Sequence, residues 1–230
     1  MERLDFDIEQ YFRNKEALGR REVERKALRI DQAALEAKLE SLGSRIVFDG
    51  SVLSEYYSGP PSDLFKDFRE EEVIAAISRE RNDYWARLRM IQEGDRVLYF
   101  AETRYRLVGD DAETQFEEPG GLVEPEKFEA IKRDYKTLGL RLKDRELKKR
   151  KIIVLPGENS GEYYKGLEYA IDTIVAPVST IPTYLEIEAI SMEVFSIGMQ
   201  KIGFSLNDLT NISARRLIEQ ALASTSTTNS

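Results

Sequence analysis

The chain of 230 residues contains no cysteine and no histidine. Without cysteine it cannot form disulfides, zinc ribbons or a thiol nucleophile. Without histidine it lacks His-based acid–base catalysis, the Ser-His-Asp triad and every histidine metal site. A metal ion would have to bind to Asp and Glu oxygens, which favours hard cations such as Mg²⁺, Mn²⁺ or Ca²⁺.

Long apolar runs are also missing from the sequence. No run approaches the roughly 20 residues that a membrane helix needs, and residues 1–19 carry acidic side chains where a signal peptide would be apolar. We therefore expect a cytoplasmic protein with no membrane partner. The net charge of -8 argues against general binding of nucleic acid, which requires a basic face.

A chain of this length can form one domain with short appendages. We expect an N-terminal helical extension over residues 1–19, a main domain over 20–221 and a disordered Ser/Thr/Asn tail over 222–230. The hydrophobic residues make up 41% and the charged residues 33%, which is typical of a globular domain with a highly charged surface.

The hydrophobic periodicities predict strands and helices in runs rather than in strict alternation. Strands are expected at 20–30, 44–57, 84–91, 96–107, 114–118, 145–156, 168–175 and 184–190, and helices at 32–42, 63–79, 125–138, 192–202 and 206–221. This order predicts the α+β class, with a mainly antiparallel sheet or barrel and helices packed outside.

Paired carboxylates occur on two of the predicted strands. Glu22, Glu24 and Lys26 alternate along the first strand and share one face, and Glu186 and Glu188 do the same on the last. Like charges this close are costly unless a cation neutralises them. The alternative is an exposed strand face whose charges are solvated.

Basic residues also recur two apart on the strands between these pairs. They are Arg87 and Arg89, Arg104 and Arg106, and the run Lys148 to Lys151, which leads into Ile152-Ile153-Val154. Each pair falls on one strand face. For the run at 148–151, a solvated charge run at the end of an element remains an equal alternative.

Motifs of this kind occur in the same order in the CYTH, or triphosphate tunnel metalloenzyme, superfamily, which the chain resembles over residues 20–221. That superfamily includes class IV adenylate cyclases, thiamine triphosphatases and inorganic tripolyphosphatases. The segments around Leu138-Gly139-Leu140 and from Ile202 to Leu209 resemble the cyclase-like branch. The resemblance implies a closed, mainly antiparallel β-barrel that forms a triphosphate tunnel, with Mg²⁺ or Mn²⁺ as cofactor.

The resemblance also implies roles for individual residues. The metal ligands would be Glu22, Glu24, Glu186 and Glu188. The phosphate-binding residues would be Lys26, Arg87, Arg89, Arg104, Lys148 and Arg150, with Lys26 also catalytic. Asp172, Arg106 and Glu117 are further candidates.

The implied function is metal-dependent hydrolysis of inorganic tripolyphosphate, thiamine triphosphate or a nucleoside triphosphate. One alternative is a class IV-like adenylate cyclase that makes cyclic AMP from ATP. Another is a non-catalytic module that binds phosphate or polyphosphate. The feature that speaks for this alternative is the segment around Gln115, which lacks the arginine usual in the family. The expected partner is a small-molecule triphosphate, and a homodimer is left open.

Overall fold

The computed structural model describes residues 1–3, 8–17, 21–58, 84–107, 115–117, 120–137, 139–157 and 166–227. The helix predicted at 63–79 lies outside these residues.

The described strands form one 10-stranded sheet. They are β1 (Glu2–Arg3), β2 (Arg21–Ala27), β3 (Arg45–Ser58), β4 (Tyr84–Glu93), β5 (Arg96–Leu107), β6 (Gln115–Glu117), β7 (Gly120–Val123), β8 (Arg141–Val154), β9 (Leu167–Ala176) and β10 (Tyr184–Ala189). Their order is β1-β3-β4-β5-β6-β2-β10-β9-β8, β7 lies beside β5, and β8 also pairs with β3. Apart from the parallel pairing of β1 with β3, these pairings are antiparallel.

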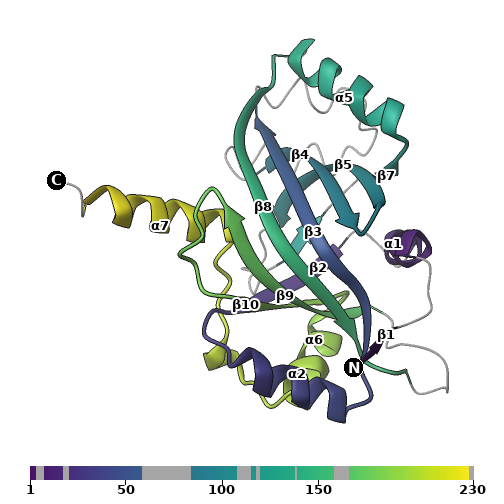
Figure 1. Ribbon diagram of the computed structural model, residues 1–230, viewed down its shortest axis with the longest axis vertical. Helices are drawn as coiled ribbons and strands as arrows, with labels where there is room; N and C mark the ends of the chain where they lie inside the picture. The colour runs from purple at the N-terminus through teal and green to yellow at the C-terminus, as the bar shows by residue number, and fades with distance from the viewer. Residues whose placement is uncertain are drawn as a thin grey trace.

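Strands β3 and β8 are the longest in the sheet, with 14 residues each, and they run side by side along the molecule (Figure 1). Their register begins with Arg45 opposite Val154 and ends with Ser58 opposite Arg141. Strands β4 and β5 form a hairpin that turns at Gly94, whose φ of 58° lies in the region that favours glycine.

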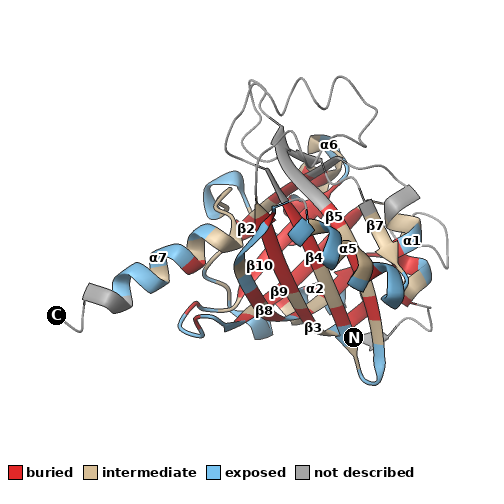
Figure 2. Cartoon of the chain, turned by 90° about the horizontal axis from the view of Figure 1, so that it is seen from above, coloured by how far each residue is buried: buried red, intermediate tan, exposed pale blue. Residues whose placement is uncertain are grey.

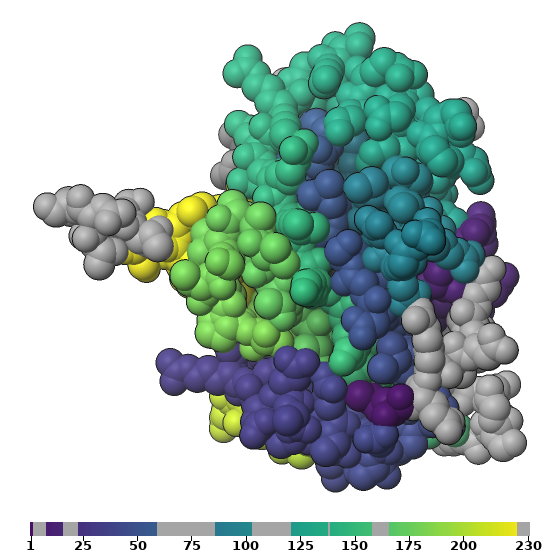
Figure 3. Space-filling model, viewed as in Figure 1, coloured from purple at the N-terminus to yellow at the C-terminus, as the bar shows by residue number. Residues whose placement is uncertain are grey.

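The helices lie around this sheet (Figure 1). They are α1 (Ile8–Ala17), α2 (Gln32–Ser41), α5 (Pro125–Thr137), α6 (Met192–Lys201) and α7 (Ala214–Thr227), with a short 3₁₀ turn, η1 (Leu206–Asp208). Helix α7 extends away from the body, whereas the residues of α2 lie against its lower surface (Figure 3).

Local sequence signals fix the ends of the helices. The Asp31 side chain accepts a hydrogen bond from the Ala34 amide at the start of α2, and Ser191 caps α6 through the Val194 amide in the same way. Gly43 follows α2 with a φ of 75°, which ends the helix.

Buried residues concentrate on the strands (Figure 2). One face of β2, β9 and β10 packs against α2 and α6, where Leu39, Phe195 and Ile187 are fully buried in one hydrophobic cluster. Helix α5 packs through Phe128 on the corresponding face of β4. These contacts leave the opposite faces of the same strands turned toward one another.

Two predictions near the C-terminus are wrong. A single helix was expected at 206–221, but the chain forms η1, then leaves helical geometry where Thr210 bridges to Lys26, and only then begins α7. The disordered tail expected from residue 222 is helical to Thr227, because good helix formers such as Leu222 and Ala223 extend an established helix. Strand β7 at Gly120–Val123 was not among the predicted strands.

The α+β class, the antiparallel sheet and the helices packed outside it are confirmed. Among the described helices, we find none with the length and apolarity needed to cross a membrane.

Candidate functional site

Alternation along the strands places charged side chains on the face opposite the helices. On β10, Leu185 and Ile187 belong to the cluster under α2 and α6, whereas Glu186 and Glu188 point to the other face and are also buried. We call the buried charged residues on these opposite faces the charged interior. Its members are Glu24, Lys26, Arg87, Glu102, Glu146, Lys148, Arg150, Glu168, Asp172, Glu186 and Glu188.

Arg150 lies at the centre of the charged interior. Its Nε and Nη2 each donate a 2.7 Å hydrogen bond to Asp172, which has no solvent exposure. Nη2 also donates to Glu186 at 2.5 Å and Nη1 to Glu188 at 3.2 Å. One guanidinium therefore neutralises carboxylates from two neighbouring strands, which is the fork geometry that suits arginine.

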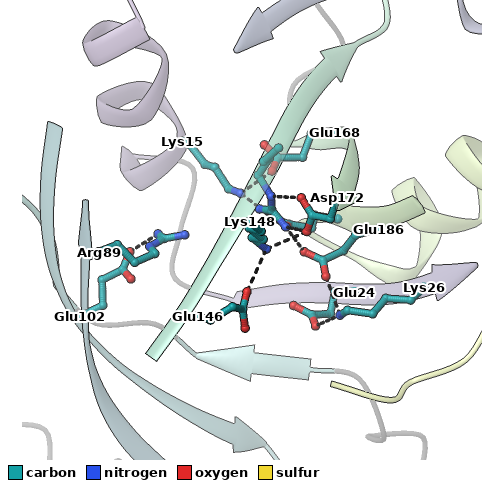
Figure 4. Close-up of polar contacts among 12 residues, drawn as sticks. Lys15, Glu24, Lys26, Arg89, Glu102, Glu146, Lys148, Glu168, Asp172 and Glu186 are labelled. Atoms are coloured by element: carbon teal, nitrogen blue, oxygen red, sulfur yellow. Dashed lines mark hydrogen bonds and ion pairs between the residues drawn. The ribbon is translucent and has the colours of Figure 1, made fainter. Parts of the chain in front are cut away.

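Lys26 connects β2 to the same group. Its Nζ lies 2.6 Å from Oε1 of Glu24 and 2.5 Å from Oε2 of Glu186 (Figure 4). The register of β2 and β10 explains this contact, since Glu186 lies opposite Lys26 and Glu188 opposite Glu24. Lys148 on β8 completes the group through a 2.7 Å bond to Asp172.

A second part of the charged interior lies on β4 and β5. Arg87 donates to Oε2 of Glu102 at 2.8 Å, and Arg89 donates to Oε1 of the same carboxylate. The guanidinium of Arg89 also lies over the Phe100 ring, 5.3 Å from its centroid. In Figure 4 the Arg89 side chain points toward Lys148 and the residues on β8 to β10.

Helix α1 contributes two further polar side chains to the site. Tyr11 donates its hydroxyl hydrogen to Glu168. Lys15 Nζ donates to Glu168 at 2.9 Å (Figure 4) and to Glu188 at 2.7 Å. Sequence analysis assigned no function to either residue.

Burial and neighbouring charges shift the carboxyl groups in different directions. Burial raises the pKa of Glu168 to about 7, although Lys15 acts to lower it. Burial would likewise raise the pKa of Glu188, but Lys15 and Arg150 outweigh it and hold the pKa well below its usual range. The pKa of Glu186 is raised, chiefly by burial, despite the opposing effect of Lys26.

Two cations of the site, Lys26 and Arg150, keep their protons. Burial acts to lower the pKa of Lys26, but Glu186 and Glu24 outweigh it and raise the pKa. The Arg150 pKa is raised well above its usual range, because Asp172 and Glu186 outweigh the effect of burial. Both side chains are therefore charged at neutral pH.

The donor set fits a hard divalent metal ion only in part. Within the part of the chain that the structure describes, no three carboxylates are grouped closely enough to hold a metal ion. The oxygens are nevertheless of the right type, and the buried Oε2 of Glu146 has no hydrogen-bond partner among the described residues. Lys26 stands between Glu24 and Glu186, where its ammonium group supplies the neutralising charge.

The structure thus brings together most of the predicted residues whose side chains it describes. Lys148, Arg150, Asp172, Glu186 and Glu188 form one bonded group with Lys26 and Glu24, and Arg87 and Arg89 lie on β4. All of these residues except Arg89, which is partly exposed, are buried, and this rules out for them the alternative of solvated charges on an exposed face. The side chains of Glu22, Arg104, Arg106 and Glu117 lie outside the described residues.

Four residues of the site escaped sequence analysis. Glu102, Glu146 and Glu168 continue the two-residue alternation of recognised neighbours, so that period could have identified them. Lys15 has no such signal, because it comes from a helix that is distant in sequence from its partners.

Several solved structures share the fold of this chain at low sequence identity. No family model matches the chain, and no curated protein matches its sequence. A conserved hypothetical protein from Pyrococcus furiosus is 18% identical, with a TM-score of 0.56 over 84% of this chain and 97% of that chain. The PH1012 protein from Pyrococcus horikoshii OT3 is 15% identical, with a TM-score of 0.55 over 84% and 96% of the two chains.

A candidate adenylate cyclase from Vibrio parahaemolyticus is also similar. It is 14% identical, with a TM-score of 0.55 over 87% of this chain and 99% of that chain. Identities this low establish a shared fold and leave the reaction open. The likeness therefore shows that this chain shares the fold of these three proteins.

Proposed function

We propose that the charged interior binds a triphosphate and hydrolyses it with the help of Mg²⁺ or Mn²⁺. The observation that carries this proposal is the buried group around Arg150, in which cations and carboxylates from β2, β8, β9 and β10 meet. Burying this many charges is expensive for a purely structural purpose, since well-packed apolar residues stabilise a core equally well or better.

A tunnel is the enclosure that suits this chemistry. The strand pairings lead from β3 through β4, β5, β6, β2, β10, β9 and β8, and β8 pairs with β3 again. This path supports a closed barrel whose inner face is the charged interior. Exclusion of water would strengthen the attraction between the phosphate oxygens and the buried cations.

Binding in this proposal requires an exchange of partners. Lys26, Lys148 and Arg150 are paired with carboxylates in the structure. A triphosphate would take over hydrogen bonds from these cations, with Arg150 offering the bidentate geometry that phosphate prefers. The freed oxygens of Glu24, Glu186 and Glu188, with those of Glu22, would then hold the metal ion.

A divalent ion held by these carboxylates would supply charge neutralisation during phosphoryl transfer. Lys26 is the residue that we assign to the reacting phosphate. Because its pKa is raised, Lys26 serves to stabilise negative charge, and it does not act as a base toward water. Asp172, whose pKa is lowered because Arg150 and Lys148 outweigh the effect of burial, orients both cations.

A cyclase is the second candidate, because a candidate adenylate cyclase shares the fold. Hydrolysis demands a bound triphosphate, a metal ion and water. Cyclisation also requires the ribose 3′-oxygen to lie in line with the leaving pyrophosphate. We therefore favour hydrolysis.

Product analysis tests the proposal. The purified chain would be incubated with Mn²⁺ or Mg²⁺ and tripolyphosphate, thiamine triphosphate or ATP, and the products followed by ³¹P NMR. Release of orthophosphate that is lost in Glu188→Gln and kept in the exposed control Glu193→Gln supports hydrolysis. Cyclic AMP and pyrophosphate from ATP would identify the cyclase instead, and binding without turnover would identify a binding module.

A further inference from the structure

Helix α1 packs directly against the strands that form the charged interior. Ile8, Tyr11 and Phe12 are each at most 6% exposed and belong to one cluster with interior-facing residues of β3, β4, β5, β8 and β9. The Phe12 ring meets Phe100 of β5 edge to face, with centroids 5.1 Å apart. The N-terminal helix is therefore part of the domain and fixes the position of its own polar side chains.

Those polar side chains reach a carboxylate pair on β9 and β10. Glu168 and Glu188 lie opposite each other in the strand register, and Lys15 donates to both. The other oxygen of Glu188 accepts from Arg150. A single carboxylate thus separates the Lys15 ammonium from the cation at the centre of the site.

Lys15 also lies where a ligand can reach it. Its side chain is 30% exposed, while those of Glu168 and Glu188 are 5% and 7% exposed. The ammonium group therefore stands at the border between solvent and the charged interior. Its arrangement repeats that of Lys26, which is also shared between carboxylates of two strands.

We propose that Lys15 is a phosphate-binding residue and holds the phosphate at the α1 end of the bound triphosphate. This inference rests on the proposed function, because it uses the same exchange of carboxylate for phosphate. Lysine suits the position, since a compact ammonium group on a long stem can turn from Glu168 and Glu188 to a nearby phosphate oxygen. In this way α1 supplies a residue that the strands alone do not provide.

Calorimetric titration with tripolyphosphate in the presence of Mg²⁺ tests this inference. Lys15→Met should weaken binding about tenfold, the effect of losing one charge-assisted hydrogen bond. Lys15→Arg should recover most of the affinity. Arg13→Met, which removes a charge that pairs with Glu9 on the same helix, should bind as the unmodified chain does.

The Tyr11→Phe variant distinguishes the effect of the Lys15 ammonium group from the effect of the position of α1. This variant loses the other polar contact between α1 and Glu168 but keeps Lys15, and we expect it to bind tripolyphosphate normally. Equal losses in Tyr11→Phe and Lys15→Met would overturn the inference, and so would unchanged or tighter binding by Lys15→Met. Absence of binding by the unmodified chain would instead refute the proposed function itself.

Discussion

Arg150 on β8 donates a 2.5 Å hydrogen bond to Glu186 on β10, although β9 lies between these two strands. The same guanidinium also bonds Asp172 on β9. One side chain therefore spans three strands, and its loss should be felt in the fold as well as in the chemistry.

Replacing Arg150 by Met should destabilise the protein strongly. Asp172, Glu186 and Glu188 would lose a shared counter-charge while staying buried, and breaking a buried ion pair typically costs about 3–5 kcal/mol. Urea unfolding measures the loss. The exposed neighbour Lys149→Met should change the free energy of unfolding by less than about 0.5 kcal/mol, and equal losses in both variants would contradict the prediction.

Arg89→Ala should weaken the binding of tripolyphosphate about tenfold, because one charge-assisted hydrogen bond is removed. Titration calorimetry gives the affinity, and circular dichroism checks that the fold is intact. Arg96→Ala, at an exposed position of β5, is the matched control. Unchanged affinity in Arg89→Ala would remove this residue from the site.

Protonation of Glu102 at low pH should make the protein less stable. Burial opposes the shift, but Arg87 and Arg89 outweigh it and lower the pKa of Glu102 to about 2. Since the folded pKa lies below the unfolded one, the unfolded state binds the proton first. The stabilisation is complete above about pH 4.5 and is lost as the pH falls through about 2.

Urea unfolding between pH 2 and pH 7 tests this dependence. Glu102→Gln should be less stable than the unmodified chain at pH 7 by about 3 kcal/mol, and the difference should shrink as the pH approaches 2. A difference that stays constant over this range would show that Glu102 does not titrate as predicted.

Gly198→Ala should destabilise the contact between α6 and β9. A Cβ atom at this position would lie 2.5 Å from Cδ1 of Leu167, which is itself buried. The overlap should outweigh the gain of about 1 kcal/mol in helix propensity and leave a net loss of about 1–3 kcal/mol. Thermal unfolding measures the change, with the exposed Gln200→Ala as control, and a stabilised Gly198→Ala variant would disprove the close packing.

Sequence reasoning succeeded where a residue's surroundings follow from local periodicity. The alternation of Leu185, Glu186, Ile187 and Glu188 identified a strand with one apolar and one acidic face. The structure adds that both faces are buried. The helix predicted at 32–42 also follows from local signals, since Asp31 caps the start of α2 and Gly43 follows its end.

Reasoning from the sequence failed where the deciding contact lies far along the chain. Nothing in the sequence around Lys15 indicates that Glu168 and Glu188 will lie beside it. The break between η1 and α7 has a similar cause. Thr210 exchanges backbone hydrogen bonds with Lys26, and this long-range bridge replaces the helix that local propensity favours.

The pairing of β2 with β10 also bears on synthesis of the chain. Ala27 lies opposite Leu185, so β2 leaves the ribosome on the order of ten seconds before its partner does, at typical translation rates. During that interval the edge of β2 that will pair with β10 has no partner strand, and the apolar side chain of Val23 lies on this unpaired strand. Glu24 and Lys26 alternate with the apolar residues, and their charges disfavour pairing of this unpaired edge with other nascent chains. The charges proposed to bind metal and phosphate in the finished protein would thus first protect the incomplete chain from aggregation.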